Sequence, residues 1–165
     1  MFERILVAVD GSETAQHGFT IAVAFARERK AVLDVLFVVD ETPMLQGLSM
    51  ASYVPPDVFD GLDASLRETG AKVLAACETQ AARDGLQVHP IIEVTVGEPV
   101  SSVILRVAVR QRSELIVLGT HGRRGLVRLT MGSDAEAVVR SAPVPVLLVR
   151  HPTLAQPEPK ATNAS

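Results

Sequence analysis

The sequence predicts a single α/β domain built on a doubly wound sheet of five parallel strands, with helices on both faces. Short apolar runs of strand length alternate with longer amphipathic stretches, and this alternation is typical of parallel sheets with right-handed crossovers. The run at 115–118, Leu-Ile-Val-Leu, is apolar throughout, which indicates burial on both faces of the sheet. The 165 residues suffice for one such core.

The first half of the chain opens on an apolar run at residues 4–9, and Ser12 is a suitable N-cap for a helix that reaches about residue 30. Four apolar residues recur there at helical spacing and are expected to face the sheet: Phe19, Ala22, Val23 and Ala26. The second strand is predicted at 32–39, interrupted only by Asp34.

A long helix is predicted over residues 57–84, and Gly85 fits its end. Its expected apolar stripe is Leu62, Leu66, Val73 and Leu74. The later elements are a strand at 88–96, a helix from Pro99 to about 112, a strand at 115–118, a short helix beginning near Asp134 and a strand at 144–149.

Composition excludes several classes of protein. The net charge of −3 argues against a dedicated nucleic-acid binder, which is normally basic. The single cysteine, Cys77, forms no internal disulfide and is expected to be an inert packing residue, and the four histidines show no metal-ligand spacing. No signal peptide or membrane span is evident, so we expect a cytoplasmic protein.

The segment 119–133 carries the strongest functional signal, because it opens from a buried strand through several glycines into a helix. Glycines allow a close approach of the backbone to a ligand, and a helix start offers unpaired N–H groups to a phosphate. Arg123, Arg124 and Arg128 add positive charge to the same segment. The segment therefore predicts a phosphate site.

Gly119, Gly122 and the pair Gly132-Ser133 are separated by two and nine residues, a spacing that resembles the nucleotide-binding signature of the universal stress protein family. The runs at 5–12 and 142–149 look like the first and last strands of that family. The resemblance covers roughly residues 1–150 and implies the strand order 3-2-1-4-5. In that order the first and fourth strands are neighbours, so that Asp10 and Gly119 are expected on the two walls of one crevice.

The resemblance also implies which residues contact an adenine nucleotide. On the adenine and ribose side these are Ala8, Val9, Asp10 and Val38. From the fourth strand onward they are Leu118, Gly119, His121, Gly122, Arg123, Arg124, Gly132, Ser133, Asp134 and Ala135. For some of them a structural role is the alternative: Asp10 caps the next helix, the two loop glycines only form turns, Ser133 is an N-cap with or without a phosphate contact, and the two arginines are solvated.

Asp134 is a departure from the family, in which the position after the Gly-Ser pair is usually uncharged. One interpretation is that its carboxylate complements the positive end of its own helix. The other is that Mg²⁺ bridges this carboxylate to the phosphates, which predicts magnesium-dependent binding of ATP.

The resemblance implies a universal stress protein that binds Mg-ATP and signals as a homodimer paired through the edge strand 144–149. No Walker motif and no paired nucleophile and base appear, so we expect at most slow hydrolysis of ATP. The alternatives are an interaction module without useful nucleotide affinity and a nucleotide-processing enzyme.

The apolar insertion at 40–56 has two interpretations. It either folds back over the sheet edge or a partner subunit, or serves as a mobile lid over the nucleotide. Residues 151–165 have little to bury and are expected to form a flexible tail.

Overall fold

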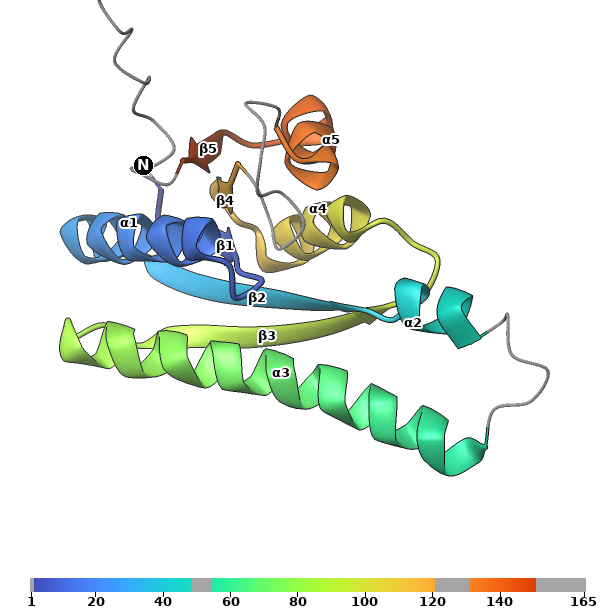
Figure 1. The fold of residues 1–165 in the computed structure, drawn as a ribbon. Helices are drawn as coiled ribbons and strands as arrows, with labels where there is room; N and C mark the ends of the chain where they lie inside the picture. Colours follow the sequence, from blue (N-terminus) through green and yellow to red (C-terminus); the bar gives the residue numbers. More distant parts are fainter. Residues whose placement is uncertain (1, 49–54, 121–130, 151–165) are drawn as a thin grey trace, which may run out of the picture.

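A computed structural model describes residues 2–48, 55–120 and 131–150 of the chain, without the side chains of residues 56 and 59. Figure 1 shows its alternation of strands and helices. In chain order the elements are β1 (Arg4–Ala8), α1 (Glu13–Arg29), β2 (Val32–Asp40), α2 (Thr42–Leu48), α3 (Pro56–Arg83), β3 (Val88–Thr95), α4 (Val100–Gln111), β4 (Leu115–Gly119), α5 (Ser133–Ser141) and β5 (Val146–Val149).

The sheet has the order β3-β2-β1-β4-β5, and every neighbouring pair is parallel. The predicted fold class and strand order are therefore confirmed. The central strand β1 pairs with β2 and with β4, so that Val7 lies opposite both Val35 and Val117. Parallel strands end at the same edge, and this brings the carboxyl ends of β1, β2 and β4 together.

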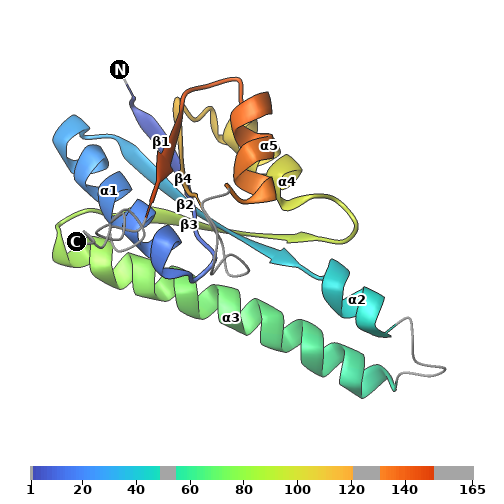
Figure 2. The same cartoon turned by 45° about the horizontal axis from the view of Figure 1, so that its top comes forward.

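Helices cover both faces of the sheet (Figures 1 and 2). Successive side chains of a strand point to opposite faces, so the odd-numbered positions of β1 pack with α1 and α3 and the even-numbered position Leu6 packs with α4 and α5. The predicted stripe of α1 is confirmed, since Phe19, Ala22, Val23 and Ala26 are all buried. Cys77 is buried in the same layer, and burial raises the pKa of its thiol to about 11.

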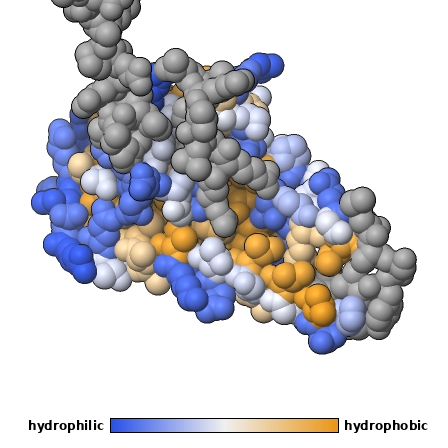
Figure 3. Space-filling view, viewed as in Figure 1, coloured by the Kyte–Doolittle hydropathy of each residue, from blue (hydrophilic) through white to orange (hydrophobic). Residues whose placement is uncertain are grey.

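The long helix α3 departs from the expected packing. Leu74 is buried, but Leu62, which was predicted to face the core, is 41% exposed. The cause is the length of α3, whose amino-terminal turns project past the end of the sheet toward α2 (Figures 1 and 2). Apolar side chains are therefore visible on the side of the molecule where α3 and α2 lie (Figure 3), and Val58 is among the exposed ones.

The insertion at 40–56 contains the short helix α2, which its composition did not predict. Three of its apolar residues, Met44, Leu45 and Leu48, are half-buried. Met50 and Tyr53 lie outside the described residues, as does the segment 151–165 that was expected to form a tail.

The remaining boundaries agree with the predictions or differ by one or two residues. The fifth strand begins at Val146 rather than at residue 144, after Pro143 and Pro145, which cannot donate a backbone hydrogen bond. Pro99 is the N-cap of α4 and lies just before its first turn.

Candidate functional site

The candidate site lies at the carboxyl ends of β1 and β4, the neighbouring strands from which the chain departs in opposite directions along the sheet. α1, which follows β1, and α4, which precedes β4, cover different faces. This is the switch point where ligands bind in open α/β sheets. As predicted, Asp10 follows β1 on one side and Gly119 ends β4 on the other.

Asp10 orders the turn that leads from β1 into α1. Its Oδ1 atom accepts a hydrogen bond of 2.9 Å from the backbone N–H of Ser12, and Gly11 between them has a φ of +84°. Ser12 is the N-cap, because its Oγ accepts a hydrogen bond of 3.2 Å from Ala15 N–H. The predicted cap is confirmed, and Asp10 positions the capping residue instead of capping the helix itself.

Ala8 and Val38 contribute apolar surface beside Asp10. Both are half-buried at the ends of neighbouring strands and pack against the cluster beneath α4 and α5. Val9 and Leu118 are each only 5% exposed. Their side chains belong to the core, so a nucleotide would meet mainly their backbone.

Gly119 is a glycine for a reason that the sequence did not reveal. A Cβ atom at this position would lie 3.0 Å from Thr14 Cγ2 and 3.2 Å from Ala15 N, both in the first turn of α1. With contacts this short the first turn of α1 would have to move by a few tenths of an ångström, so the close packing of α1 on β4 favours glycine here. This preference holds whether or not a ligand binds.

The two ends of the glycine-rich segment meet at a backbone hydrogen bond. Gly132 N–H donates to Thr120 O over 2.9 Å, and Thr120 N–H donates to Val149 O of β5 over 2.9 Å. The start of α5 is thereby fixed next to the end of β4. Four predicted contacts within the segment, His121, Gly122, Arg123 and Arg124, lie outside the described residues.

The first turn of α5 begins one position earlier than predicted. Gly132 is the N-cap, with extended backbone angles, and Ser133 is the first helical residue, so the prediction of Ser133 as N-cap is wrong by one residue. Gly132 carries no side chain that could cap this turn. Ala135 is buried, so its side chain faces the core.

Asp134 makes a contact that neither interpretation of the sequence included. Its Oδ1 atom accepts a hydrogen bond of 3.1 Å from Ser101 N–H, in the first turn of α4. The carboxylate therefore caps a neighbouring helix rather than its own. Within the described ranges, no group of three or more His, Cys, Asp or Glu side chains is placed to hold a metal ion.

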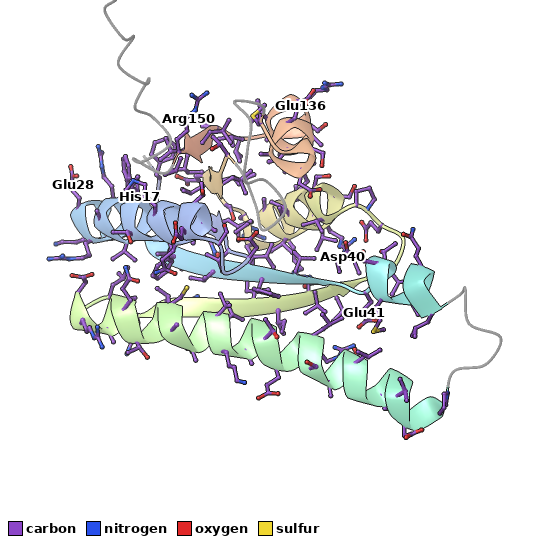
Figure 4. The ribbon with its side chains drawn as sticks, in the orientation of Figure 1. His17, Glu28, Asp40, Glu41, Glu136 and Arg150 are labelled. Atoms are coloured by element: carbon purple, nitrogen blue, oxygen red, sulfur yellow. The ribbon has the colours of Figure 1, made fainter. Side chains whose placement is uncertain are left out.

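A second polar cluster, which sequence reasoning missed, lies where β2 leads into α2 (Figure 4). Glu41 Oε1 accepts a hydrogen bond of 3.1 Å from Arg67 Nη2, and Arg67 Nε binds Asp63 Oδ1 over 2.9 Å. A hydrogen bond with Asp63 and burial raise the pKa of Glu41, whereas Arg67 lowers the pKa of Asp63. The spacing of Asp63 and Arg67 was a signal for their pair, but nothing local pointed to Glu41.

Comparison with known proteins gives one consistent result. The model of the universal stress protein family matches residues 1–150. The universal stress protein YxiE of Bacillus subtilis is 34% identical over 91% of this chain and 100% of its own length. A solved structure from the same family, from Burkholderia pseudomallei, is 33% identical with a TM-score of 0.68, over 89% of this chain and 95% of that chain.

Two more distant solved structures, each 19% identical, share the fold. One is a universal stress protein in complex with cAMP, with a TM-score of 0.60 over 90% of this chain and 97% of that chain. The other is the Archaeoglobus fulgidus protein in complex with dAMP, with a TM-score of 0.58 over 90% of this chain and 98% of that chain. In the part of the chain that the structure describes, no helix is long and apolar enough to cross a membrane.

Proposed function

This chain belongs to the universal stress protein family, and from that membership we propose that it binds ATP, as Mg-ATP, in the crevice between β1 and β4. The observation that carries the proposal is the hydrogen bond between Thr120 O and Gly132 N–H. It brings the two halves of the glycine signature together at the switch point of the sheet, where a phosphate-binding turn is of use.

The phosphates are bound by the first turn of α5, whose backbone N–H groups form the positive end of a helix. Ser133 adds its hydroxyl, and Arg123 and Arg124 act as bidentate phosphate ligands. The adenine packs against Ala8 and Val38, with the backbone of Val9 and Leu118 beside it. Asp10 binds the ribose.

Magnesium arrives with the nucleotide. Mg²⁺ prefers oxygen ligands and is usually held by one or two carboxylates together with substrate phosphates. The described residues fit this arrangement better than a cage of protein ligands, because they contain no group of three potential ligands. Asp134 lies within the phosphate-binding turn, and its Oδ1 atom already accepts a hydrogen bond from Ser101 N–H.

Occupancy by ATP serves as the signal of a cytoplasmic homodimer in the stress response, and hydrolysis is slow at most. An adenine nucleotide is the chemical class supported by the cAMP and dAMP complexes of the two distant relatives. The dimer forms along β5, the short strand at one edge of the sheet.

The test is calorimetric titration with Mg-ATP, together with thermal unfolding. ATP at about 100 times its dissociation constant adds roughly 2.7 kcal/mol to the free energy of unfolding. Gly122→Val abolishes this gain because it blocks the approach of the backbone to the phosphates. Gly61→Val is the matched control, since nothing lies within 4 Å of a Cβ atom at Gly61.

A wild-type protein that shows neither heat of binding nor a thermal shift in millimolar Mg-ATP would contradict the proposal. Mass spectrometry of the denatured protein identifies any nucleotide that was retained during purification. Slow loss of γ-phosphate during the titration would indicate hydrolysis, and a stable dimer without affinity for nucleotide would indicate an interaction module.

A further inference from the structure

The hydrogen bond from Ser101 to Asp134 joins the first turns of two helices. α4 has Pro99 as its N-cap, and a proline side chain offers no acceptor. Ser101 is only 6% exposed, so its N–H group needs a partner within the protein. Asp134 supplies that partner at 3.1 Å and places a negative charge at the positive end of α4.

Besides the backbone hydrogen bond from Gly132 N–H to Thr120 O, which fixes where α5 starts, the described contacts of α5 with its neighbours are mostly apolar. It spans only nine residues, of which Ala135 and Val138 are buried. Val138 lies in the same apolar cluster as Val103 and Val107 of α4. Apolar contact is non-directional, whereas a hydrogen bond to a carboxylate has a preferred distance and angle. The Gly132–Thr120 bond fixes where α5 starts, and the Asp134–Ser101 bond is the directional contact that sets how its first turn is oriented on α4.

We propose that Asp134 is a positioning residue of the nucleotide site, which aims the first turn of α5 at the phosphates by holding it on the first turn of α4. This inference rests on the proposed function. It also accounts for an aspartate beside a phosphate site: the charge is directed into the positive end of a second helix and is partly compensated there. Asp134 then acts through α4 and not through a metal ion.

Three variants separate positioning from charge and from metal binding. Asp134→Ala removes the acceptor, and Asp134→Asn keeps a side-chain oxygen at the same position. Glu136→Ala removes a negative charge from the same turn of α5, on which the exposed Glu136 is labelled in Figure 4. Glu136 forms an ion pair with Arg140. Affinity for ATP is measured by calorimetry for each protein, once with Mg²⁺ and once with EDTA.

If Asp134 positions the first turn of α5, removing its carboxylate weakens the binding of ATP. If the carboxylate acts only through its charge, removing it has the opposite effect. Removing a carboxylate near a phosphate strengthens binding if only repulsion matters. We expect Asp134→Ala to weaken binding about ten-fold, the equivalent of one lost charge-assisted hydrogen bond. Asp134→Asn stays near the wild type, and Glu136→Ala binds as tightly as the wild type or tighter. The loss is the same in Mg²⁺ and in EDTA.

Other results overturn the proposal. Tighter binding by Asp134→Ala shows that charge dominates. A loss of affinity for ATP that occurs in both Asp134 variants, and only with Mg²⁺, shows that Asp134 is a metal ligand. A lower melting temperature of Asp134→Ala with unchanged affinity shows a role in stability alone.

Hydrogen exchange at the Ser101 amide, measured without nucleotide, separates this inference from the proposed function. Asp134→Ala lowers the protection of that amide, whereas Asp134→Asn and Glu136→Ala preserve it. Unchanged protection in Asp134→Ala overturns the inference even if ATP binds. If the wild type binds no ATP, the proposed function fails, and with it the role of Asp134 toward phosphate.

Discussion

Arg4 of β1 and Asp34 of β2 form a two-point ion pair, with Arg4 Nε 2.7 Å from Asp34 Oδ2 and Arg4 Nη2 3.0 Å from Asp34 Oδ1. Asp34 is fully buried, and its hydrogen bond raises the pKa of Arg4. Gln111 of α4 accepts from Arg4 Nη2, and His89 Nδ1 of β3 lies 3.4 Å from Asp34 Oδ1. One carboxylate thus links three strands and a helix at the end of the sheet opposite the proposed nucleotide site.

Asp34→Ala is expected to lower the free energy of unfolding by about 3 kcal/mol, because it leaves Arg4 without its partner at a partly buried position. The double variant Arg4→Met/Asp34→Leu loses less, since it removes both charges and fills the volume. Urea unfolding measures both values. A single variant within 1 kcal/mol of the wild type would show that water replaces the pair.

Gly119→Ala tests the close packing of α1 on β4. A methyl group at Gly119 meets Thr14 and the backbone of Ala15, so we expect a loss of about 1–3 kcal/mol from overpacking. Gly61→Ala is the matched control with the opposite sign, because Gly61 lies in α3 with open space around it. Alanine there stabilises the helix by roughly 0.5–1 kcal/mol. Equal effects of the two variants in thermal unfolding would refute the packing argument.

Local patterns in the sequence predicted the buried face of one helix and failed for part of another. Periodicity predicted the buried face of α1 because residues at helical spacing share one face, and this face of α1 packs on the sheet along its length. The residues are Phe19, Ala22, Val23 and Ala26. Periodicity was wrong for Leu62 because the same spacing occurs where α3 has projected past the sheet. Pattern alone cannot say where a neighbouring layer ends.

The candidate site shows the same limit. The glycine spacing, together with the family resemblance, placed Asp10 and Gly119 at one switch point. The capping of α4 by Asp134 joins residues 33 positions apart, and the packing of Thr14 on Gly119 joins helix α1 to strand β4. Such contacts depend on how elements distant in the sequence pack against each other, and a short stretch of sequence does not predict that packing.

The raised pKa of Glu41 predicts that the stability of the protein depends on pH. Its pKa is raised by the hydrogen bond with Asp63 and by burial, so the folded state holds this proton more tightly than the unfolded state. The stability that it contributes is fully present below the pKa of the unfolded chain and is lost as the pH rises through the folded pKa. Glu41→Gln should therefore gain melting temperature relative to the wild type as the pH rises from about 4 to 7.

Glu68→Gln is the control for this titration. Lys72 lowers the pKa of Glu68, so its contribution is present above the unfolded pKa and is lost as the pH falls. The melting temperature of Glu68→Gln should fall relative to the wild type over the same interval. Parallel curves for the Glu41 and Glu68 variants would contradict the assignment of opposite shifts.

The edge strand β5 has backbone groups that can pair with those of a second subunit. The carbonyl group of Pro145 accepts a hydrogen bond from Ile116 of β4, and that of Val149 accepts one from Thr120, which directly follows β4. Since successive groups of a strand point to opposite sides, those of Val146 and Leu148 point outward. An unprotected edge invites pairing, and pairing with the same strand of a second copy removes the edge with two-fold symmetry.

Leu147→Asp should therefore give monomers or insoluble protein, because it places a charge in the strand that pairs. Leu147 also packs partly against the core, so circular dichroism must first show that the variant is folded. Val109→Asp is the control: Val109 is 64% exposed on α4, away from the edge, and should remain dimeric. Light scattering at micromolar concentration decides the question, and a wild type that is monomeric there rules out the β5 dimer.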